Sequence, residues 1–206
     1  MRIAHISDLH LNSIFRKTHI GKTKKLIKLA LEKGFDHLVI TGDISDNSEE
    51  NDFIILRKIL KSFDLLDSRI TSIFIGNHDI FGGIQKAEEI LTFHEKCEGV
   101  HYKEHVNNFI SYFAETFDNC YHLSPKEFFP VAKRINNTLL IGLNSVAQYS
   151  KLSNPFGSNG EISASQFGEL YELLKSADND VKYKIVMIHH HFNKIKSEAK
   201  STFGSI

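Results

Sequence analysis

The sequence has few cysteines, no excess of either charge and no long hydrophobic run. Its two cysteines, Cys97 and Cys120, lie in unrelated local contexts, which favours free thiols in a reducing compartment over a disulfide framework. Lysine plus arginine and aspartate plus glutamate each number 25, so no basic field favours nucleic acid. The start of the chain lacks the pattern of an export signal, and apolar runs such as 185–188 are far shorter than a membrane span. We therefore expect a cytoplasmic protein without membrane partners.

Short β-rich apolar runs alternate with helical patterns, which predicts an α/β fold. A length of 206 residues suits one hydrophobic core, so we expect a single domain over residues 1–206. Strands are predicted at 2–7, 37–41, 70–75, 129–135, 138–143 and 183–188, and helices at 20–32, 50–66, 85–97, 106–117 and 163–174. Asn136-Asn137 predicts a tight hairpin between two of the strands, and mixed sheets follow from it.

Two of the predicted helices carry local signals. In the first helix, Leu26, Ile27 and Leu31 recur at helical spacing, which predicts that they form its buried face. In the last helix, Ser163 and Gln166 fit a capping box, in which each side chain binds the backbone amide of the other residue.

Four polar residues each follow directly after an apolar, strand-like run. They are Asp8, Asp43, Asn77 and His189. In an α/β sheet, residues just beyond the carboxyl ends of the strands converge on one crevice, where ligands bind. Because these side chains supply oxygen and nitrogen donors, the positions predict a metal site.

The types of donor indicate which metals fit. Asp8 and His10 are two residues apart in an extended segment, so both can reach one ion, and Asp43 can bridge two. Asn77 adds a neutral amide oxygen, which leaves the cations Lewis acidic. This mixture of carboxylate, amide and imidazole suits two ions of Mn, Fe, Zn, Co or Ni better than Ca or Mg.

His78 follows Asn77 and is expected on the substrate side, where an imidazole can protonate a leaving alkoxide. Asp46 is expected to orient that imidazole. Two roles are open for Asp79: it caps the following turn, or it holds a ligand from behind. Asn12, just beyond His10, either contacts a bound phosphate or caps a turn.

Taken together, these residues resemble the motifs of the calcineurin-like metallophosphoesterase superfamily over essentially the whole chain. The matching motifs are Asp8-x-His10, Gly42-Asp43-x-x-Asp46, Gly76-Asn77-His78-Asp79 and the strand-end His189. The resemblance implies a four-layer α/β/β/α sandwich and hydrolysis of phosphoesters by a hydroxide that bridges two metal ions. In detail the motifs look most similar to those of bacterial cyclic-nucleotide and glycerophosphodiester phosphodiesterases, so a phosphodiesterase or phosphatase is expected.

The resemblance also implies a role for each residue. One ion would be held by Asp8, His10 and Asp43, and the other by Asp43, Asn77 and His189. The catalytic imidazole would be His78, with Asp46 as its partner.

The end of the sequence departs from the superfamily pattern. Of three consecutive histidines, His189 is the expected ligand, with His190 as the alternative and His191 as a substrate contact. The Gly-His-x-His that supplies two more ligands does not follow, so we expect that the C-terminal part of the fold is missing. Truncation is favoured over a contribution from another chain or loss of catalysis. The alternative function is a binding or scaffolding protein on the same fold.

Overall fold

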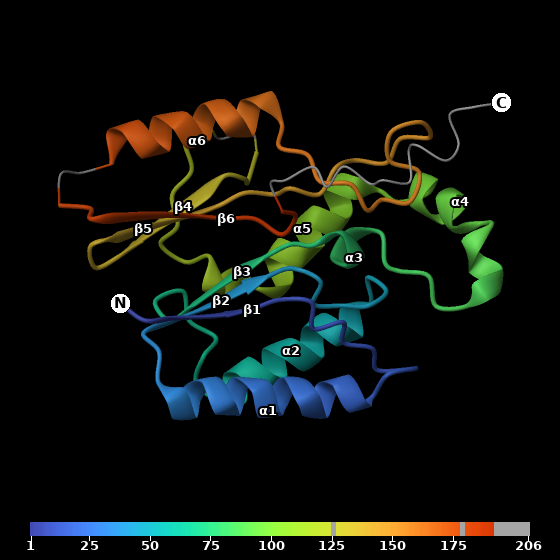
Figure 1. Cartoon of the computed structure of the whole chain (residues 1–206), viewed down its shortest axis with the longest axis horizontal. Helices are drawn as coiled ribbons and strands as arrows, with labels where there is room; N and C mark the ends of the chain where they lie inside the picture. The colour runs from blue at the N-terminus through green and yellow to red at the C-terminus, as the bar shows by residue number, and fades with distance from the viewer. Residues whose placement is uncertain (125–126, 178–179, 192–206) are drawn as a thin grey trace, which may run out of the picture.

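The computed structural model describes residues 1–124, 127–177 and 180–191, and within them two three-stranded sheets lie face to face (Figure 1). The first sheet has the order β1 (Ile3–Ile6), β2 (His37–Thr41) and β3 (Thr71–Phe74), all parallel. The second has the order β4 (Val131–Ile135), β5 (Thr138–Gly142) and β6 (Tyr183–Met187). Because β4 runs antiparallel and β6 parallel to β5, only the second sheet is mixed. All six predicted strands are present. The prediction that the C-terminal part of the fold is missing concerns the chain beyond His191, which lies outside the described residues.

Helices cover the outer faces of both sheets. Figure 1 shows α1 (Thr18–Lys33) and α2 (Glu50–Ser62) beneath the first sheet and α6 (Ala164–Ser176) above the second. This order of layers confirms the α/β/β/α sandwich. Between β3 and β4 lie α3 (Asn77–Ile80), η1 (Ala87–Ile90), α4 (Phe93–Glu98), α5 (Tyr102–Tyr112) and η2 (Ala114–Thr116). No helix in the described part of the chain is both long and apolar enough to cross a membrane.

The core follows from the two-residue periodicity of the strands. In β5, Leu140 packs into the cluster shared with the first sheet, while Leu139 and Ile141 pack toward α6. The two sheets pack closely where the ring of Phe74 lies against Gly142: a Cβ at that position would overlap the ring. Glycine in β5 therefore allows the first sheet to pack tightly on the second.

Several helix predictions need correction. In α1 the buried residues are Thr23 and Ile27, whereas Leu26 and Leu31 are exposed. Leu26 is turned by about 100° from Ile27, out of the contact with the sheet. The predicted helix 85–97 is instead a short 3-10 turn followed by α4, and the predicted helix 106–117 begins earlier, at Tyr102, and ends at Tyr112.

The hairpin prediction is confirmed, and the capping box is half correct. Ile135 pairs with Thr138 across the turn, and Asn136 has a positive φ of 53°. Ser163 accepts the backbone N–H of Gln166 at 3.2 Å. The Gln166 side chain does not reach back, because its oxygen accepts the backbone N–H of Asn144 at 3.0 Å and its nitrogen donates to the carbonyl of the same residue at 2.9 Å. It thereby fixes the chain that leaves β5.

Candidate metal centre

The first two loops beyond the strands run side by side. The backbone N–H of Asp8 donates to the carbonyl of Gly42 at 3.2 Å, and that of His10 to the carbonyl of Asp43 at 2.9 Å. The loops at the carboxyl ends of β1 and β2 therefore bring Asp8, His10 and Asp43 close together. α3 begins at Asn77, three residues after β3 ends at Phe74, and lies at the same end of the molecule (Figure 1).

The backbone is strained where these loops meet. Asp8, His10 and Asp43 have φ values of 56°, 41° and 51°, which L residues with a Cβ rarely adopt. Strain of this kind is concentrated at functional sites, where the surrounding structure enforces it. A Cβ on Gly42 would lie only 2.5 Å from the backbone nitrogen of Gly76, so glycine allows the β2 and β3 loops to approach.

The carboxylate of Asp43 lies at the centre of the site. Its Oδ2 is 3.7 Å from Nε2 of His10, and its Oδ1 is 3.4 Å from Nε2 of His189. Two groups of donors, each with its atoms within 4.8 Å of one another, share this residue: one adds His10 and His78, and the other adds Asp8 and His189. Asp43 is buried, so its two oxygens face two separate sets of ligands away from bulk solvent.

The contacts of His189 fit a cation. Nδ1 lies 2.8 Å from the carbonyl of Thr41, which accepts a ring proton. Nε2 lies 3.1 Å from Oδ1 of Asn77 and 3.4 Å from the Asp43 carboxylate, and both of those oxygens are also acceptors. With the ring proton on Nδ1, the Nε2 lone pair faces two acceptor oxygens with no proton to share, which is an arrangement that a metal ion satisfies.

The contacts of His10 lead to the same conclusion. Nε2 lies 3.9 Å from Asp8 and 3.7 Å from Asp43, while the buried Nδ1 makes no hydrogen bond, although Oδ1 of Asp46 is 3.3 Å away. Burial, followed by the positive charge that His78 can carry, lowers the pKa of His10 in spite of the nearby carboxylates. A neutral imidazole is the form that binds a metal. These carboxylate and imidazole donors could therefore hold a metal ion.

Asp46 touches both histidines of the site, through different groups. Nδ1 of His78 lies 2.9 Å from the main-chain carbonyl of Asp46 and 3.9 Å from its carboxylate. The carboxylate itself is closer to His10 than to His78. The expected contact between Asp46 and His78 is thus made chiefly by the carbonyl. Gly83 packs against the same edge of the ring, since a Cβ there would lie 2.7 Å from Nδ1 of His78 and 3.1 Å from the carbonyl of Asp46.

Asp79 has roles close to the two that the sequence left open, but it caps its own helix rather than the following turn and holds backbone rather than a ligand side chain. Its Oδ1 accepts the backbone N–H groups of Ile44 and Ser45, and its Oδ2 accepts that of Gly76, each at 2.9 Å. It thus caps the start of α3 and holds the loop that carries Asp43. Burial, followed by the charge of Asp43, raises the pKa of Asp79 well above its usual range, and the three N–H donors oppose this shift.

The remaining predicted residues lie around this cluster. Asn12 is buried, and its Nδ2 donates to Oδ2 of Asp46 at 3.1 Å. Nδ1 of His190 lies 2.9 Å from the hydroxyl of Ser145, whereas His189 belongs to one of the groups of donors, so His189 is the better ligand of the two. His191 is exposed at the end of the last described segment.

Sequence reasoning missed two residues of the site. Arg16 lies 3.5 Å from the carboxylate of Asp46, and Gln85 accepts a hydrogen bond from Asn12 at 3.1 Å. The only sequence signal for Arg16 is its position a few residues after His10. Gln85 has none.

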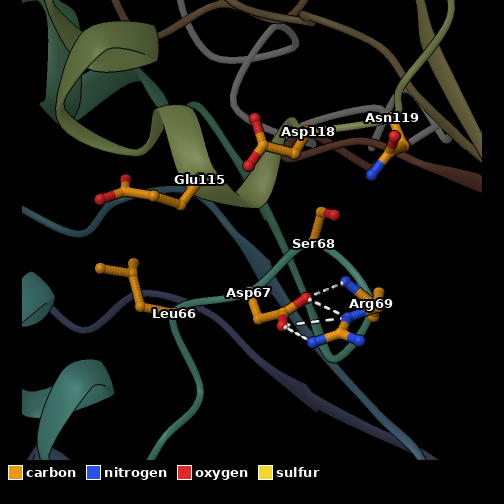
Figure 2. Close-up of a pocket in the computed structure, with 7 residues that line it drawn as sticks. All are labelled: Leu66, Asp67, Ser68, Arg69, Glu115, Asp118 and Asn119. Atoms are coloured by element: carbon orange, nitrogen blue, oxygen red, sulfur yellow. Dashed lines mark hydrogen bonds and ion pairs between the residues drawn. The ribbon is translucent and has the colours of Figure 1, made fainter.

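A cavity of about 290 Å³ lies apart from this cluster (Figure 2). It is formed by residues that precede β3 and by residues in and after η2: Leu66, Asp67, Ser68, Arg69, Glu115, Asp118 and Asn119. Because residues before a strand and residues after it lie at opposite ends of the sheet, this cavity is remote from Asn77. The guanidinium of Arg69 donates to both carboxylate oxygens of Asp67 there.

The fold and the site define an α/β sandwich with candidate metal ligands at the carboxyl ends of its strands. The family model described as calcineurin-like phosphoesterase matches residues 1–205, and the chain belongs to that family. Membership supports metal-dependent hydrolysis of phosphoesters as the general activity. A comparison with curated proteins found no match.

Proposed function

We propose that this protein hydrolyses phosphodiesters or phosphomonoesters at a centre of two metal ions. The single observation that carries the proposal is the position of Asp43, whose oxygens lie 3.7 Å from His10 and 3.4 Å from His189. A carboxylate between two cations is the recurring device of two-metal phosphoryl chemistry.

The division of ligands between the two ions is taken from the family resemblance; the distances alone group Asp43 with His10 and His78 and with Asp8 and His189. Asp8, His10 and Asp43 would hold one ion. Asp43, Asn77 and His189 would hold the other, and Mn, Fe, Zn, Co or Ni suits both sets. When bound, the ions would polarise a phosphoryl oxygen and lower the pKa of a water molecule toward neutrality.

The chain itself supplies a proton donor. The carbonyl of Asp46 receives the Nδ1 proton of His78, so Nε2, on the other side of the ring, is left to exchange a proton with the substrate. The side chain of His78 is about one quarter exposed, at 26%, which leaves it accessible from the site. We infer that His78 protonates the leaving oxygen of the ester.

Hydrolysis of bis(p-nitrophenyl) phosphate by the manganese-loaded protein tests this function. Asp43→Asn and His78→Ala should each lower kcat by about 100-fold or more, because one removes the shared ligand and the other the proton donor. Asp64→Asn is the matched control: Asp64 is exposed and has a similar φ of 55°, and this variant should keep wild-type activity. A wild-type protein that binds manganese but hydrolyses neither diesters nor monoesters would favour a scaffold.

A further inference from the structure

A short loop beside the candidate metal centre is fastened to Asp46 at both ends. Asn12 donates to Oδ2 of Asp46 at 3.1 Å, and a guanidinium nitrogen of Arg16 lies 3.5 Å from the same oxygen. Within the loop, the backbone N–H of Arg16 donates to the carbonyl of Asn12 at 3.2 Å. The oxygen of the Asn12 side chain accepts the backbone N–H groups of Ile14 and Phe15 at 3.1 and 2.7 Å. The loop is therefore ordered next to the site.

Arg16 is the cation of this loop that can reach an anion. Its side chain is 48% exposed, whereas that of Asp46 is 4% exposed and lies 3.3 Å from His10. The contact of Arg16 with Asp46 is long, at 3.5 Å, and the side chain is half exposed, so its planar guanidinium can make a two-pronged contact with phosphoryl oxygens. Asn12 is less suited to bind phosphate, because its side-chain amide already forms hydrogen bonds with Asp46, Gln85 and the backbone of the loop.

Exposed apolar side chains flank this cation. Ile14 and Phe15 are 63% and 61% exposed, although their backbone is fixed by Asn12. Ile84, which is 39% exposed, precedes Gln85, and the oxygen of the Gln85 side chain accepts a hydrogen bond from Asn12. Two segments that meet at Asn12 thus both present apolar surface beside the site. Such surface favours an apolar partner.

We propose that these two segments bind the substrate, and that the substrate is a phosphoester with an apolar organic group. Arg16 contacts a non-bridging phosphoryl oxygen, and Phe15 and Ile84 contact the organic group. The inference rests on the proposed function, since it concerns the substrate of the same site.

The role of Arg16 is tested with Arg16→Gln and Arg16→Lys in the manganese-loaded protein. The glutamine variant should raise KM for p-nitrophenyl phosphodiesters and weaken inhibition by inorganic phosphate, each by about tenfold or more, with a smaller change in kcat. The lysine variant keeps the charge but loses the two-pronged guanidinium, so its KM and its inhibition by phosphate should lie between those of the wild type and the glutamine variant. Arg69→Gln, at the remote cavity, is the control that leaves both values unchanged (Figure 2).

The apolar group is tested with methyl, butyl and phenyl p-nitrophenyl phosphates. The wild-type KM should be lower for the butyl and phenyl esters than for the methyl ester. Comparison of the butyl and phenyl KM values then shows whether the site prefers an aliphatic or an aromatic group. Phe15→Ser and Ile84→Ser should remove this trend, so that the KM values for the butyl and phenyl esters rise to that for the methyl ester. Leu152→Ser removes an apolar side chain that is 97% exposed on another loop, and should leave the trend intact.

The results separate this inference from the proposed function. If the wild type hydrolyses the series but Arg16→Gln keeps its KM and its phosphate inhibition, the role of Arg16 is wrong while the function stands. A KM that does not depend on the ester group, in the wild type, overturns the apolar assignment. If the wild type hydrolyses none of these esters, the proposed function is wrong. Calorimetric titration with inorganic phosphate then tests the role of Arg16 by itself: equal affinity in the wild type and Arg16→Gln rejects the phosphate contact.

Discussion

The carboxylate of Asp79 accepts the backbone N–H of Ser45 at 2.9 Å, which joins α3 to the loop that carries Asp43. The same oxygen accepts the N–H of Ile44, and the other oxygen accepts that of Gly76. Asp79 is almost fully buried, at 1% exposure. The position of the shared ligand Asp43 therefore depends on a side chain that belongs to neither group of donors.

Removal of the Asp79 carboxylate should destabilise the fold. Asp79→Ala leaves three buried N–H groups without their acceptor, and we expect a loss of about 3 kcal/mol or more in the free energy of unfolding. Asp79→Asn retains one acceptor oxygen and should lose roughly half as much. Urea unfolding at neutral pH measures both. Glu88→Ala, an exposed control, should change stability by less than about 0.5 kcal/mol; equal effects of all three variants would contradict this role of Asp79.

Gly83 should matter for activity because it packs against His78. A Cβ at Gly83 would lie 2.7 Å from Nδ1 of His78 and 3.1 Å from the carbonyl of Asp46, so Gly83→Ala must displace the imidazole. We expect kcat to fall by about tenfold or more with little change in metal affinity. Gly99→Ala is the control, since a Cβ there makes only ordinary contacts at 3.6 Å. Wild-type kcat in Gly83→Ala would show that the position of His78 does not limit the reaction.

Gly142 should be required for packing between the sheets. A Cβ at this position would overlap the ring of Phe74, so Gly142→Ala should cost about 2–3 kcal/mol or prevent folding. Phe74→Leu in the same chain should recover part of the loss by making space. Gly21→Ala, in α1 with no atom within 4 Å of the added Cβ, should instead stabilise by about 0.5–1 kcal/mol. Thermal unfolding of the four proteins distinguishes these outcomes.

The sequence predicted much of this arrangement, and the reason is visible in the chain. Asp8, Asp43, Asn77 and His189 could be identified because apolar runs mark where the strands end. Their convergence follows from the topology of α/β sheets. The layered fold was predictable for the same reason, together with the family resemblance.

Other features depend on contacts that no local pattern encodes. α3 has only four residues, too few to show a helical period. Gln85 and Asn12 meet across 73 positions of sequence. Gln166 fits a capping box with Ser163, but its side chain instead forms hydrogen bonds with the backbone of Asn144. The buried face of α1 was misassigned because several leucines compete for it, and only packing decides between them.

His37, at the start of β2, should make stability depend on pH. Burial, followed by the charge of Lys133, lowers the pKa of His37 to about 4, while an unfolded chain keeps a value near 6.5. Between these values the unfolded state binds a proton that the folded state does not, so stability is retained above pH about 6.5 and falls as the pH approaches 4. The loss should reach about 3 kcal/mol from this residue.

Urea unfolding as a function of pH measures the contribution of His37. His37→Gln should flatten the curve in this window, whereas His101→Gln, at an exposed position, should leave its slope unchanged. The same slope in His37→Gln as in the wild type would assign the pH dependence to other groups.

Calorimetric titration with Mn²⁺ tests the central claim most directly, because it asks whether Asp43 is shared by two metal sites. The wild type should bind two ions per chain, Asp43→Asn should weaken both sites by about tenfold or more, and Asn77→Ala should weaken one of them. Asp64→Asn should bind as the wild type does. A wild type that binds no Mn²⁺, or an Asp43→Asn variant with both affinities intact, would contradict the account.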